Sequence, residues 1–352
     1  MSTVAHSLEA LGPQWFTEVL REGGYATAEV ARAEAEPMVF TGAVADMARI
    51  HLGYEESGEP GPAQLIAKIR GTTEVQVGMD AAMGLYERES RFYCELAARV
   101  PVATPEIFHI GDGSDSPILM EDLGGLRAGD QVEGISVADA ERTVDALADM
   151  HAAFWNAPEL DLPWIARPAE GVYAGMIAQL VASGVDTLRE RYAGRVSDAV
   201  LDGVAEVAPR WGEVLQRCAD GPRTLVHNDC RLDNIFFAAD GSPVFVDWQV
   251  VAGTRGTQDV GNLLAGSMNV EDLGDHWEPL LRRYHERLSL RGVEDYPWEQ
   301  CLRDYRVNVL YPLGAGIALL GHLDIGDARG LGDAIVLRAL THVADLNSLE
   351  LL

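Results

Sequence analysis

The sequence predicts an α+β fold with two lobes, in which a small antiparallel sheet with a helix precedes a larger, mainly helical part. Three observations support this prediction. Short apolar runs separated by turn residues fill the first third of the chain, long amphipathic segments begin at Ser136, and a β-hairpin pattern at 235–246 interrupts them. We therefore expect an N-terminal lobe at residues 1–121 and a C-terminal lobe at residues 122–352.

The composition is typical of a globular enzyme, with 47% apolar and 23% charged residues. Its 27 basic and 55 acidic residues give a net charge of −28, which argues against nucleic acid or an anionic membrane surface as a partner. The four cysteines are scattered, which indicates neither a zinc site nor a disulfide framework. No signal-peptide pattern and no uncharged apolar run of membrane-spanning length is present, so we expect a cytoplasmic protein without membrane insertion. The composition does not indicate an oligomeric state.

The N-terminal lobe begins with a helix pattern from Pro13 to Arg21, which Gly23 and Gly24 end. Strand patterns follow at Met38–Phe40, Met47–Leu52, Gln64–Ile69, Pro105–Ile110 and Pro117–Met120. The connection from Thr41 to Asp46 predicts a hairpin turn. Asp112 and Asp115 superficially suggest a calcium loop, but their spacing is incomplete and favours a hairpin turn.

Lys68, on the strand at Gln64–Ile69, is the only lysine among the 27 basic residues. A lysine ammonium binds phosphate oxygens as a compact point charge, whereas a planar guanidinium needs more room. On the next predicted helix, at 83–98, Glu89 interrupts an apolar stripe that includes Leu85 and Phe92. A carboxylate buried there needs a partner, so we expect it to pair with Lys68. The alternative is that Lys68 is a chance survivor on an exposed face.

The C-terminal lobe is mainly helical, with predicted helices at Val137–Trp155, at Asp198–Ala219 and through most of 273–352. The most informative stretch is 225–247, in which a strand leads into a polar loop with His227, Asp229 and Asn234 and then into the hairpin. The residues that flank a hairpin lie about 5 Å apart, so Asn234 and Asp247 should be neighbours. An amide and a carboxylate at that distance suit Mg²⁺, and Asp229 nearby would orient a hydroxyl group for phosphoryl transfer.

The loop HNDCRLDN followed by VFVDWQ resembles the catalytic and metal-binding segments of the aminoglycoside phosphotransferase and choline kinase-like superfamily, especially its ecdysteroid-kinase-like branch. The segment RESRFYCEL also resembles the branch's Glu-x-x-Phe-Tyr helix, whose glutamate pairs with the strand lysine. The order YHERLSLRGVEDYPWEQCLRDYR resembles its C-terminal part. This resemblance spans nearly the whole chain and implies a bilobal, protein-kinase-like fold.

The resemblance also implies roles for residues outside the loop. Thr41 and Gly42 would belong to a loop over the nucleotide phosphates, although this loop has one glycine where protein kinases have three. Glu121 lies at the expected hinge between lobes, where backbone groups bind adenine. Asp259 would accept hydrogen bonds from the catalytic loop, or alternatively serve as a helix N-cap. Only eleven residues separate Asp247 from Asp259, which favours a small-molecule acceptor over a peptide.

We therefore expect ATP and Mg²⁺ as cofactors, with Lys68 on the α- and β-phosphates, Glu89 orienting Lys68, and Asn234 and Asp247 holding the metal. Asp229 would act as the catalytic base towards a hydroxyl of the small-molecule acceptor. Three further predictions concern its neighbours. His227 would brace the loop, Arg231 would contact the transferred phosphoryl group or form a structural salt bridge, and Cys230 would serve packing.

The sequence excludes several other enzyme classes. It has no P-loop motif around Lys68, no Gly-x-Ser-x-Gly elbow and no Gly-x-Gly-x-x-Gly after a strand. A pseudokinase or nucleotide-binding scaffold remains the alternative to an enzyme. The acidic composition would also suit an aminoglycoside or a choline-like amine as acceptor, whereas the resemblance favours a lipophilic alcohol. Tryptophans at 155, 164, 277 and 298 could line an acceptor pocket or belong to the core.

Overall fold

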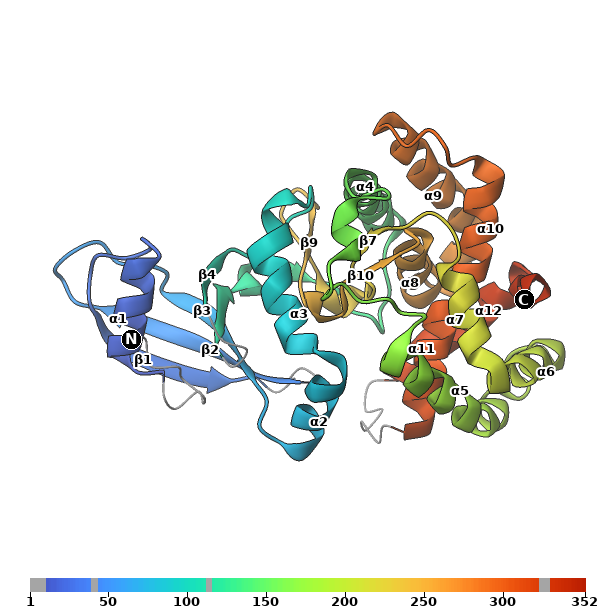
Figure 1. Ribbon diagram of the computed structural model, residues 1–352, viewed down its shortest axis with the longest axis horizontal. Coiled ribbons are helices and arrows are strands. Elements are labelled where there is room, and N and C mark those ends of the chain that lie inside the picture. Colours follow the sequence, from blue (N-terminus) through green and yellow to red (C-terminus); the bar gives the residue numbers. More distant parts are fainter. Residues whose placement is uncertain (1–10, 39–43, 112–115, 323–329) are drawn as a thin grey trace. The chain divides into compact units, whose positions relative to one another are not determined.

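A five-stranded antiparallel sheet forms the first part of the computed structural model, which describes residues 11–38, 44–111, 116–322 and 330–352. The chain divides into two units by its internal contacts. Unit 1 comprises Met1–Arg99 with Thr104–Gly125, and unit 2 comprises Val100–Ala103 with Leu126–Leu352. Unit 1 contains the sheet, and unit 2 is mainly helical, as Figure 1 shows. This division into a sheet-based part and a helical part confirms the predicted fold class.

The sheet of unit 1 has the strand order β1-β2-β3-β5-β4, with every neighbouring pair antiparallel. Its strands are β1 (Val30–Pro37), β2 (Ala45–Tyr54), β3 (Gln64–Arg70), β4 (Ile107–Ile110) and β5 (Ile118–Glu121). Helix α1 (Pro13–Glu22) buries Phe16 and Leu20 in one apolar cluster with Leu65, Ala67 and Ile69 of β3. Since side chains alternate along a strand, Lys68 lies on the opposite face of β3.

The first strand differs from the prediction. We expected a strand at Met38–Phe40 joined to one at Met47–Leu52. Strand β1 lies earlier, at Val30–Pro37, and pairs with β2; the Met38 backbone nitrogen donates to the Met47 carbonyl at 2.9 Å, and residues 39 and 40 lie outside the described residues. Most of β1 is exposed and alternates alanine with charged residues, so it lacks the apolar pattern of a strand. Thr41 and Gly42 lie outside the described residues, and so do Asp112 and Asp115.

The helix expected at 83–98 is present at 85–99, and an additional helix precedes it. Helix α2 (Glu74–Met83), which the sequence did not indicate, begins at a capping box between Thr73 and Gln76. Gly84 then takes a φ of 63°, a left-handed conformation that glycine adopts easily, and α3 (Leu85–Arg91) starts afresh. One wider π-turn (Phe92–Leu96) and a 3₁₀ turn (Ala97–Arg99) extend α3. The predicted stripe is correct, because Leu85, Glu89, Phe92 and Leu96 are all buried.

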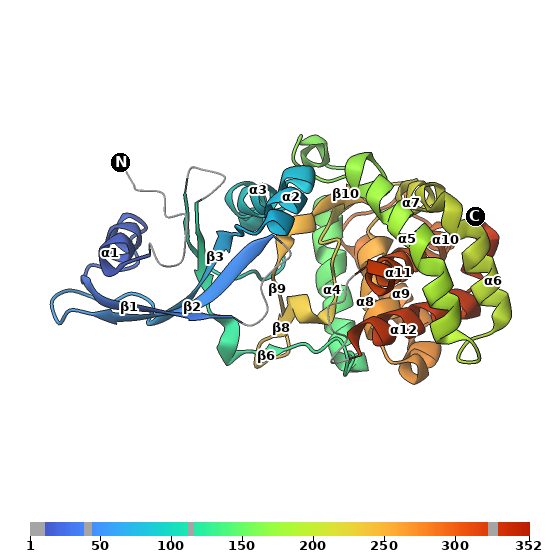
Figure 2. The ribbon, with the colours of Figure 1, turned by 90° about the horizontal axis from the view of Figure 1, so that it is seen from below.

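Unit 2 contains most of the helices. They are α4 (Val137–Ala153), α5 (Gly171–Tyr192), α6 (Asp198–Val207), α7 (Trp211–Ala219), α8 (Thr257–Ser267), α9 (Val270–Leu290), α10 (Trp298–Asn308), α11 (Leu310–His322) and α12 (Leu331–Asp345). Helix α11 packs against both α5 and α12 (Figure 2). Glycine at position 184 lets α5 and α11 approach closely. A Cβ atom there would lie only 2.8 Å from the carbonyl oxygen of Ile317 on α11.

Five short strands position the loops of unit 2. Strand β7 (Thr224–Val226) pairs antiparallel with β10 (Ala252–Thr254), and β8 (Ile235–Phe237) pairs with β6 (Arg127–Ala128) and with β9 (Pro243–Phe245). The predicted hairpin is therefore present, with Ile235 opposite Phe245. The stretch 253–257 is rich in glycine and threonine, as a flexible turn would be, but its first residues belong to β10 and Arg255 is buried beside Asp304.

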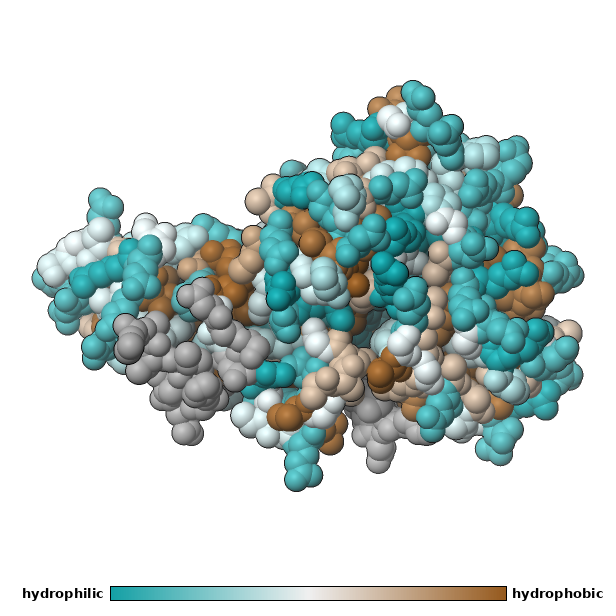
Figure 3. Space-filling view, in the orientation of Figure 1, coloured by the Kyte–Doolittle hydropathy of each residue, from teal (hydrophilic) through white to brown (hydrophobic). Residues whose placement is uncertain are grey.

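Polar residues cover most of the face in Figure 3, with smaller apolar areas between them, as expected for a chain of this charge. Among the helices of the described residues, none combines the length and the apolar character that crossing a membrane requires.

Candidate functional site

In unit 1, Lys68 and Glu89 form the predicted ion pair. Lys68 Nζ lies 2.5 Å from Glu89 Oε2, and both side chains are almost completely buried. The Tyr86 hydroxyl fixes the helix to the sheet, because it lies 2.9 and 2.8 Å from the carbonyl oxygens of Lys68 and Ser116, which share its one hydrogen. A charge buried in this way costs several kcal/mol unless its partner is in place. The ammonium therefore has a position set by both α3 and the sheet.

Glu121 ends β5 and is exposed, and its carboxylate accepts a hydrogen bond from the Glu106 backbone nitrogen at 3.2 Å. Asp122, the next residue, accepts from the Arg49 guanidinium at 2.6 Å and from the Gly124 backbone. These contacts order the segment that follows the sheet. They do not test the hinge role of Glu121, which stays a prediction.

In unit 2, the loop after β7 is held by the buried carboxylate of Asp259. Asp259 Oδ2 accepts the backbone N–H of His227 at 2.7 Å, and Oδ1 accepts that of Asn228 at 2.8 Å. His151 Nε2 lies 3.3 Å from Asp259 Oδ2 and its Nδ1 lies 2.8 Å from the Tyr284 hydroxyl. Of the two roles considered for Asp259, the structure supports loop bracing and not an N-cap, which Gly256 provides.

Asn228 takes a left-handed backbone conformation, with a φ of 70°. Asparagine tolerates this conformation better than most non-glycine residues. Its side chain is fixed as well, since Gln258 Nε2 donates to Asn228 Oδ1 and Asn228 Nδ2 donates to the Val250 carbonyl at 3.1 Å. These contacts of Asn228 thus fix the backbone immediately before Asp229.

His227 braces the same loop with both ring nitrogens. The backbone N–H of Asp229 points to His227 Nδ1 at 3.3 Å, and His227 Nε2 lies 2.8 Å from the Val246 carbonyl. With Nδ1 accepting, the hydrogen on Nε2 is donated to Val246. The ring, packed between Phe245 and Trp248, therefore ties the loop to the end of the hairpin.

Asp229 is oriented by two neighbours. Asn234 Nδ2 donates to Asp229 Oδ2 at 2.9 Å and to the Asp229 carbonyl at 3.0 Å, and Arg231 Nε lies 3.4 Å from the same Oδ2. In the part of the chain that the structure describes, no hydrogen bond to Asp229 Oδ1 occurs. One oxygen of a partly exposed carboxylate is therefore held and the other is left for a further contact.

Arg231 lies among three carboxylates. It pairs with Asp229 and, at 3.7 Å, with Asp233. The pKa of the guanidinium is raised by the charge of Asp229 most strongly, and also by Asp233 and Asp247, whereas burial lowers it. Arg231 thus takes part in a structural salt bridge in this arrangement. Burial raises the pKa of the adjacent Cys230 thiol well above its ordinary value, as expected for a packed residue.

Asp247 directly follows the hairpin and lies at its open end with Asn234. The Val246 backbone nitrogen donates to the Asn234 carbonyl at 3.0 Å, which fixes the two segments side by side. Asp247 adopts a left-handed φ of 64°, a conformation that costs a non-glycine residue about 1–2 kcal/mol. Gln249 Nε2 donates to Asp247 Oδ2 at 3.1 Å. A conformation of this kind is typical of functional positions.

These two residues fit a magnesium ion chemically. Asn234 donates from its amide nitrogen to Asp229, so its Oδ1 is the atom that remains to face a cation. An amide oxygen and a carboxylate are hard ligands, and Mg²⁺ commonly takes one or two such groups and completes its shell with phosphate and water. Within the described residues, no group of three or more His, Cys, Asp or Glu side chains is placed to hold a metal.

Several residues of the loop network were not predicted from the sequence. Gln258 and Asn262 of α8 both bind Asn228, and Gln131 accepts the Leu232 N–H at 2.7 Å. The signal in the sequence that could have indicated the first two is their position near Asp259 on the same predicted helix. Two of the four tryptophans pack against tyrosines: Trp277 stacks on Tyr305, and Trp155 lies against Tyr296.

The chain is similar to proteins of a known family and of known fold. The model of the ecdysteroid kinase-like family matches residues 41–292, which is most of the chain. No curated protein sequence matches it. Among solved structures, an ethanolamine kinase from Plasmodium vivax has a TM-score of 0.52 at 14% identity, covering 89% of this chain and 82% of that one.

Two further solved structures are similar. A choline kinase from Streptococcus pneumoniae has a TM-score of 0.51 at 15% identity, covering 90% of this chain and 94% of that one. A GDP complex of a mutant aminoglycoside 2'-phosphotransferase has a TM-score of 0.51 at 13% identity, covering 91% of this chain and 94% of that one. At these identities the likeness establishes the shared fold.

Proposed function

Because the chain belongs to the ecdysteroid kinase-like family, we propose that it is an ATP-dependent phosphotransferase that moves the γ-phosphate of ATP to a hydroxyl group of a small molecule. The observation that carries the proposal is the orientation of Asp229. One carboxylate oxygen is held by Asn234 and Arg231, on a loop braced by Asp259, and within the described residues the other oxygen makes no hydrogen bond.

In this proposal Asp229 accepts the proton of the acceptor hydroxyl. The acceptor oxygen forms a bond to the γ-phosphorus, the bond between that phosphorus and the bridging oxygen breaks, and ADP leaves with the bond's electron pair. The arrangement favours the reaction mainly through alignment, because a carboxylate fixed on one side offers its other oxygen in one direction. His227 and Asp259 act by positioning the loop, and Arg231 holds the Asp229 carboxylate.

The nucleotide needs positive charge in a protein of net charge −28. Lys68 would bind the α- and β-phosphates, with Glu89 fixing its ammonium. Asn234 and Asp247 would hold Mg²⁺, which when bound supplies positive charge to the phosphate oxygens. The buried Lys68–Glu89 pair supports this assignment, because it holds the only lysine of the chain in one place.

The acceptor can be identified by a screen. We would incubate the purified protein with ATP and Mg²⁺ and measure ADP release with sterol-like alcohols, amino sugars and choline-like amines, and then identify the phosphorylated product by mass spectrometry. The proposal expects product with at least one alcohol. ATP binding without ADP release above background for every acceptor, water included, would instead indicate a nucleotide-binding scaffold.

A further inference from the structure

Two tyrosines from different helices meet beside the catalytic loop. The hydroxyl groups of Tyr173 on α5 and Tyr311 on α11 lie 3.0 Å apart. Tyr311 is buried, whereas Tyr173 is only partly buried and lies in the first turn of its helix. Since α5 and α11 pack along each other, the position of this pair is set by helices and not by a loop.

The pair is connected to the loop through Asn228. The Tyr311 hydroxyl makes a hydrogen bond with the Asn228 side chain, whose oxygen already accepts from Gln258. The Asn228 amide group has both a hydrogen and an oxygen lone pair left for this contact, and the Tyr311 hydroxyl joins it to Tyr173. Burial, first of all, raises the pKa of Tyr311 well above its ordinary value, and the charge of the nearby Asp229 adds to this effect. Tyr311 thus keeps its proton.

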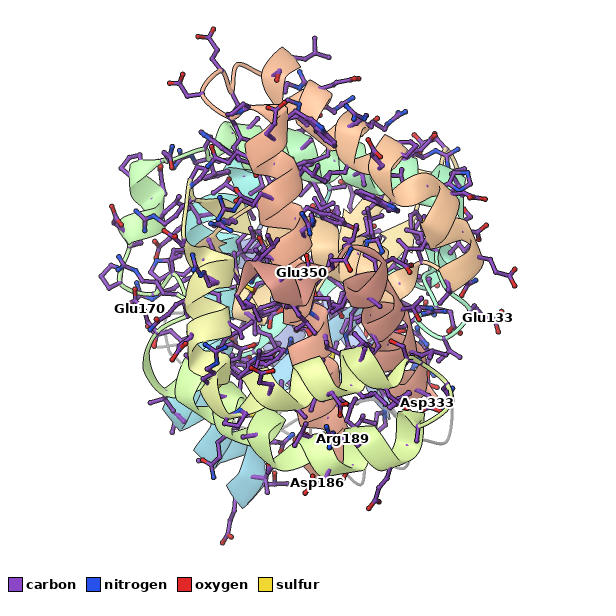
Figure 4. All side chains as sticks on the ribbon, turned by 90° about the vertical axis from the view of Figure 1, so that its right-hand side faces the viewer. Glu133, Glu170, Asp186, Arg189, Asp333 and Glu350 are labelled. Atoms are coloured by element: carbon purple, nitrogen blue, oxygen red, sulfur yellow. The ribbon has the colours of Figure 1, made fainter. Side chains whose placement is uncertain are left out.

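The surface around the pair carries no charged residue along either helix. Residues 171–185 of α5 and 310–320 of α11 lack Asp, Glu, Lys and Arg, in a chain where 23% of residues are charged. Val172, next to Tyr173, is 64% exposed. The part of α5 that carries charge begins at Asp186 and continues through Arg189, and Figure 4 shows both residues well separated from Glu170, which precedes the helix.

We propose that Tyr173 and Tyr311 form the acceptor side of the site: Tyr311 positions Asp229 through Asn228, and Tyr173 contacts a neutral, hydroxyl-bearing acceptor next to Asp229. This inference rests on the proposed phosphotransferase function and specifies its acceptor. A phenol hydroxyl beside an apolar side chain matches an uncharged ring or alcohol, whereas a polycation would require carboxylates along the same helices.

The test of the acceptor contact is Tyr173→Phe, which removes one hydroxyl and keeps the ring. With a neutral alcohol found in the screen, the KM for the acceptor should rise about tenfold, the size expected for one lost hydrogen bond, with smaller changes in kcat and in the KM for ATP. The matched control is Tyr192→Phe on the same helix, whose hydroxyl binds Asp333 at 2.8 Å in the charged half of α5. Equal acceptor KM values for Tyr173→Phe and the control would overturn the contact.

The test of the positioning role is Tyr311→Phe. It should lower kcat about tenfold with little change in the KM for ATP, because Asn228 loses the hydrogen bond to Tyr311 that helps to fix the backbone before Asp229. A loss of stability alone, without a change in kcat, would contradict the role. Amide hydrogen exchange of residues 226–234 offers a test without turnover, since Tyr311→Phe should accelerate it several-fold and Tyr192→Phe should not.

These outcomes separate the inference from the function on which it rests. If the wild type transfers phosphate to no alcohol, the phosphotransferase proposal fails, and unchanged hydrogen exchange in Tyr311→Phe would then reject the positioning role as well. If the wild type prefers cationic amines and Tyr173→Phe does not affect them, the function stands and the neutral acceptor side is rejected.

Discussion

The carboxylate of Asp259 lies 2.8 Å from the backbone nitrogen of Asn228, and its second oxygen lies 2.7 Å from that of His227. Two successive backbone N–H groups can point to one carboxylate because Asn228 is left-handed. Asp259 comes from α8 and the loop follows β7, so one side chain joins two elements and fixes the entry to Asp229.

Asp259→Asn should weaken this junction, because every partner of the carboxylate is a donor and an amide NH₂ group would face one of them. We expect the free energy of unfolding to fall by about 2–3 kcal/mol, the cost of leaving a buried polar group unsatisfied, and kcat to fall with it. Urea unfolding and steady-state kinetics measure both. Asp186→Asn, at an exposed position of α5, is the control and should change neither.

Lys68→Arg should reduce kcat/KM for ATP about 100-fold even though the charge is kept, because the buried space beside Glu89 fits an ammonium and not a wider planar guanidinium. The control is Arg49→Lys on β2 of the same sheet, which keeps the ion pair with Asp122 and should change kcat/KM for ATP little. Kinetics at varied ATP concentration measure the effect. Activity near the wild-type level in Lys68→Arg would mean that the only lysine of the chain is accidental.

Asp247→Asn should raise the Mg²⁺ concentration needed for half-maximal activity by about tenfold or more, because a charged ligand becomes neutral while its shape is kept. ATP binding measured by calorimetry should weaken in the presence of Mg²⁺ and change much less in EDTA. Equal weakening in both conditions would assign Asp247 to the fold and not to the metal.

The stability of unit 2 should depend on pH through His342. Burial lowers the pKa of His342 to about 3, and its Nε2 lies 2.8 Å from the Tyr305 hydroxyl. An unfolded histidine has a pKa of about 6.5, so between about pH 6.5 and 3 the unfolded chain binds a proton that the folded chain does not. The stabilising effect of the neutral imidazole is thus complete above about pH 6.5 and is lost as the pH falls, by up to about 1.4 kcal/mol per pH unit.

His342→Gln should therefore flatten the dependence of the unfolding free energy on pH between 6.5 and 4. Tyr305→Phe is the matched comparison, because it removes the hydrogen bond but leaves the imidazole, so stability should drop at all pH values while the slope stays. Chemical denaturation at several pH values measures both slopes. An unchanged slope in His342→Gln would assign the pH dependence to other groups.

Local patterns were sufficient to predict the hairpin and the helix stripe. Asp240 and Gly241 separate two apolar runs, and Gly241 takes the positive φ of 84° that such a turn needs, so the relation of Asn234 to Asp247 follows from nearby residues. Likewise, Glu89 interrupts an apolar stripe of period 3.6, and its burial next to Lys68 follows from the cost of an unpaired charge.

Contacts between distant segments could not be predicted in the same way. Tyr173 and Tyr311 are separated by 138 residues, and their meeting depends on how α5 packs on α11. The strand β1 has no apolar alternation, because much of it is exposed. Arg255 is buried beside Asp304, whereas a sequence rich in glycine and threonine around it predicts an exposed turn. In each case the tertiary partner decides the structure.

The most direct test of the account is the transfer of γ-labelled phosphate from ATP to an alcohol by the wild type and by Asp229→Asn. We expect labelled product with the wild type, a rate at least about 1,000-fold lower with Asp229→Asn, and unchanged ATP affinity in that variant. Asp240→Asn, in the exposed hairpin turn, is the matched control and should transfer at the wild-type rate. Transfer by Asp229→Asn close to that of the control would contradict the account.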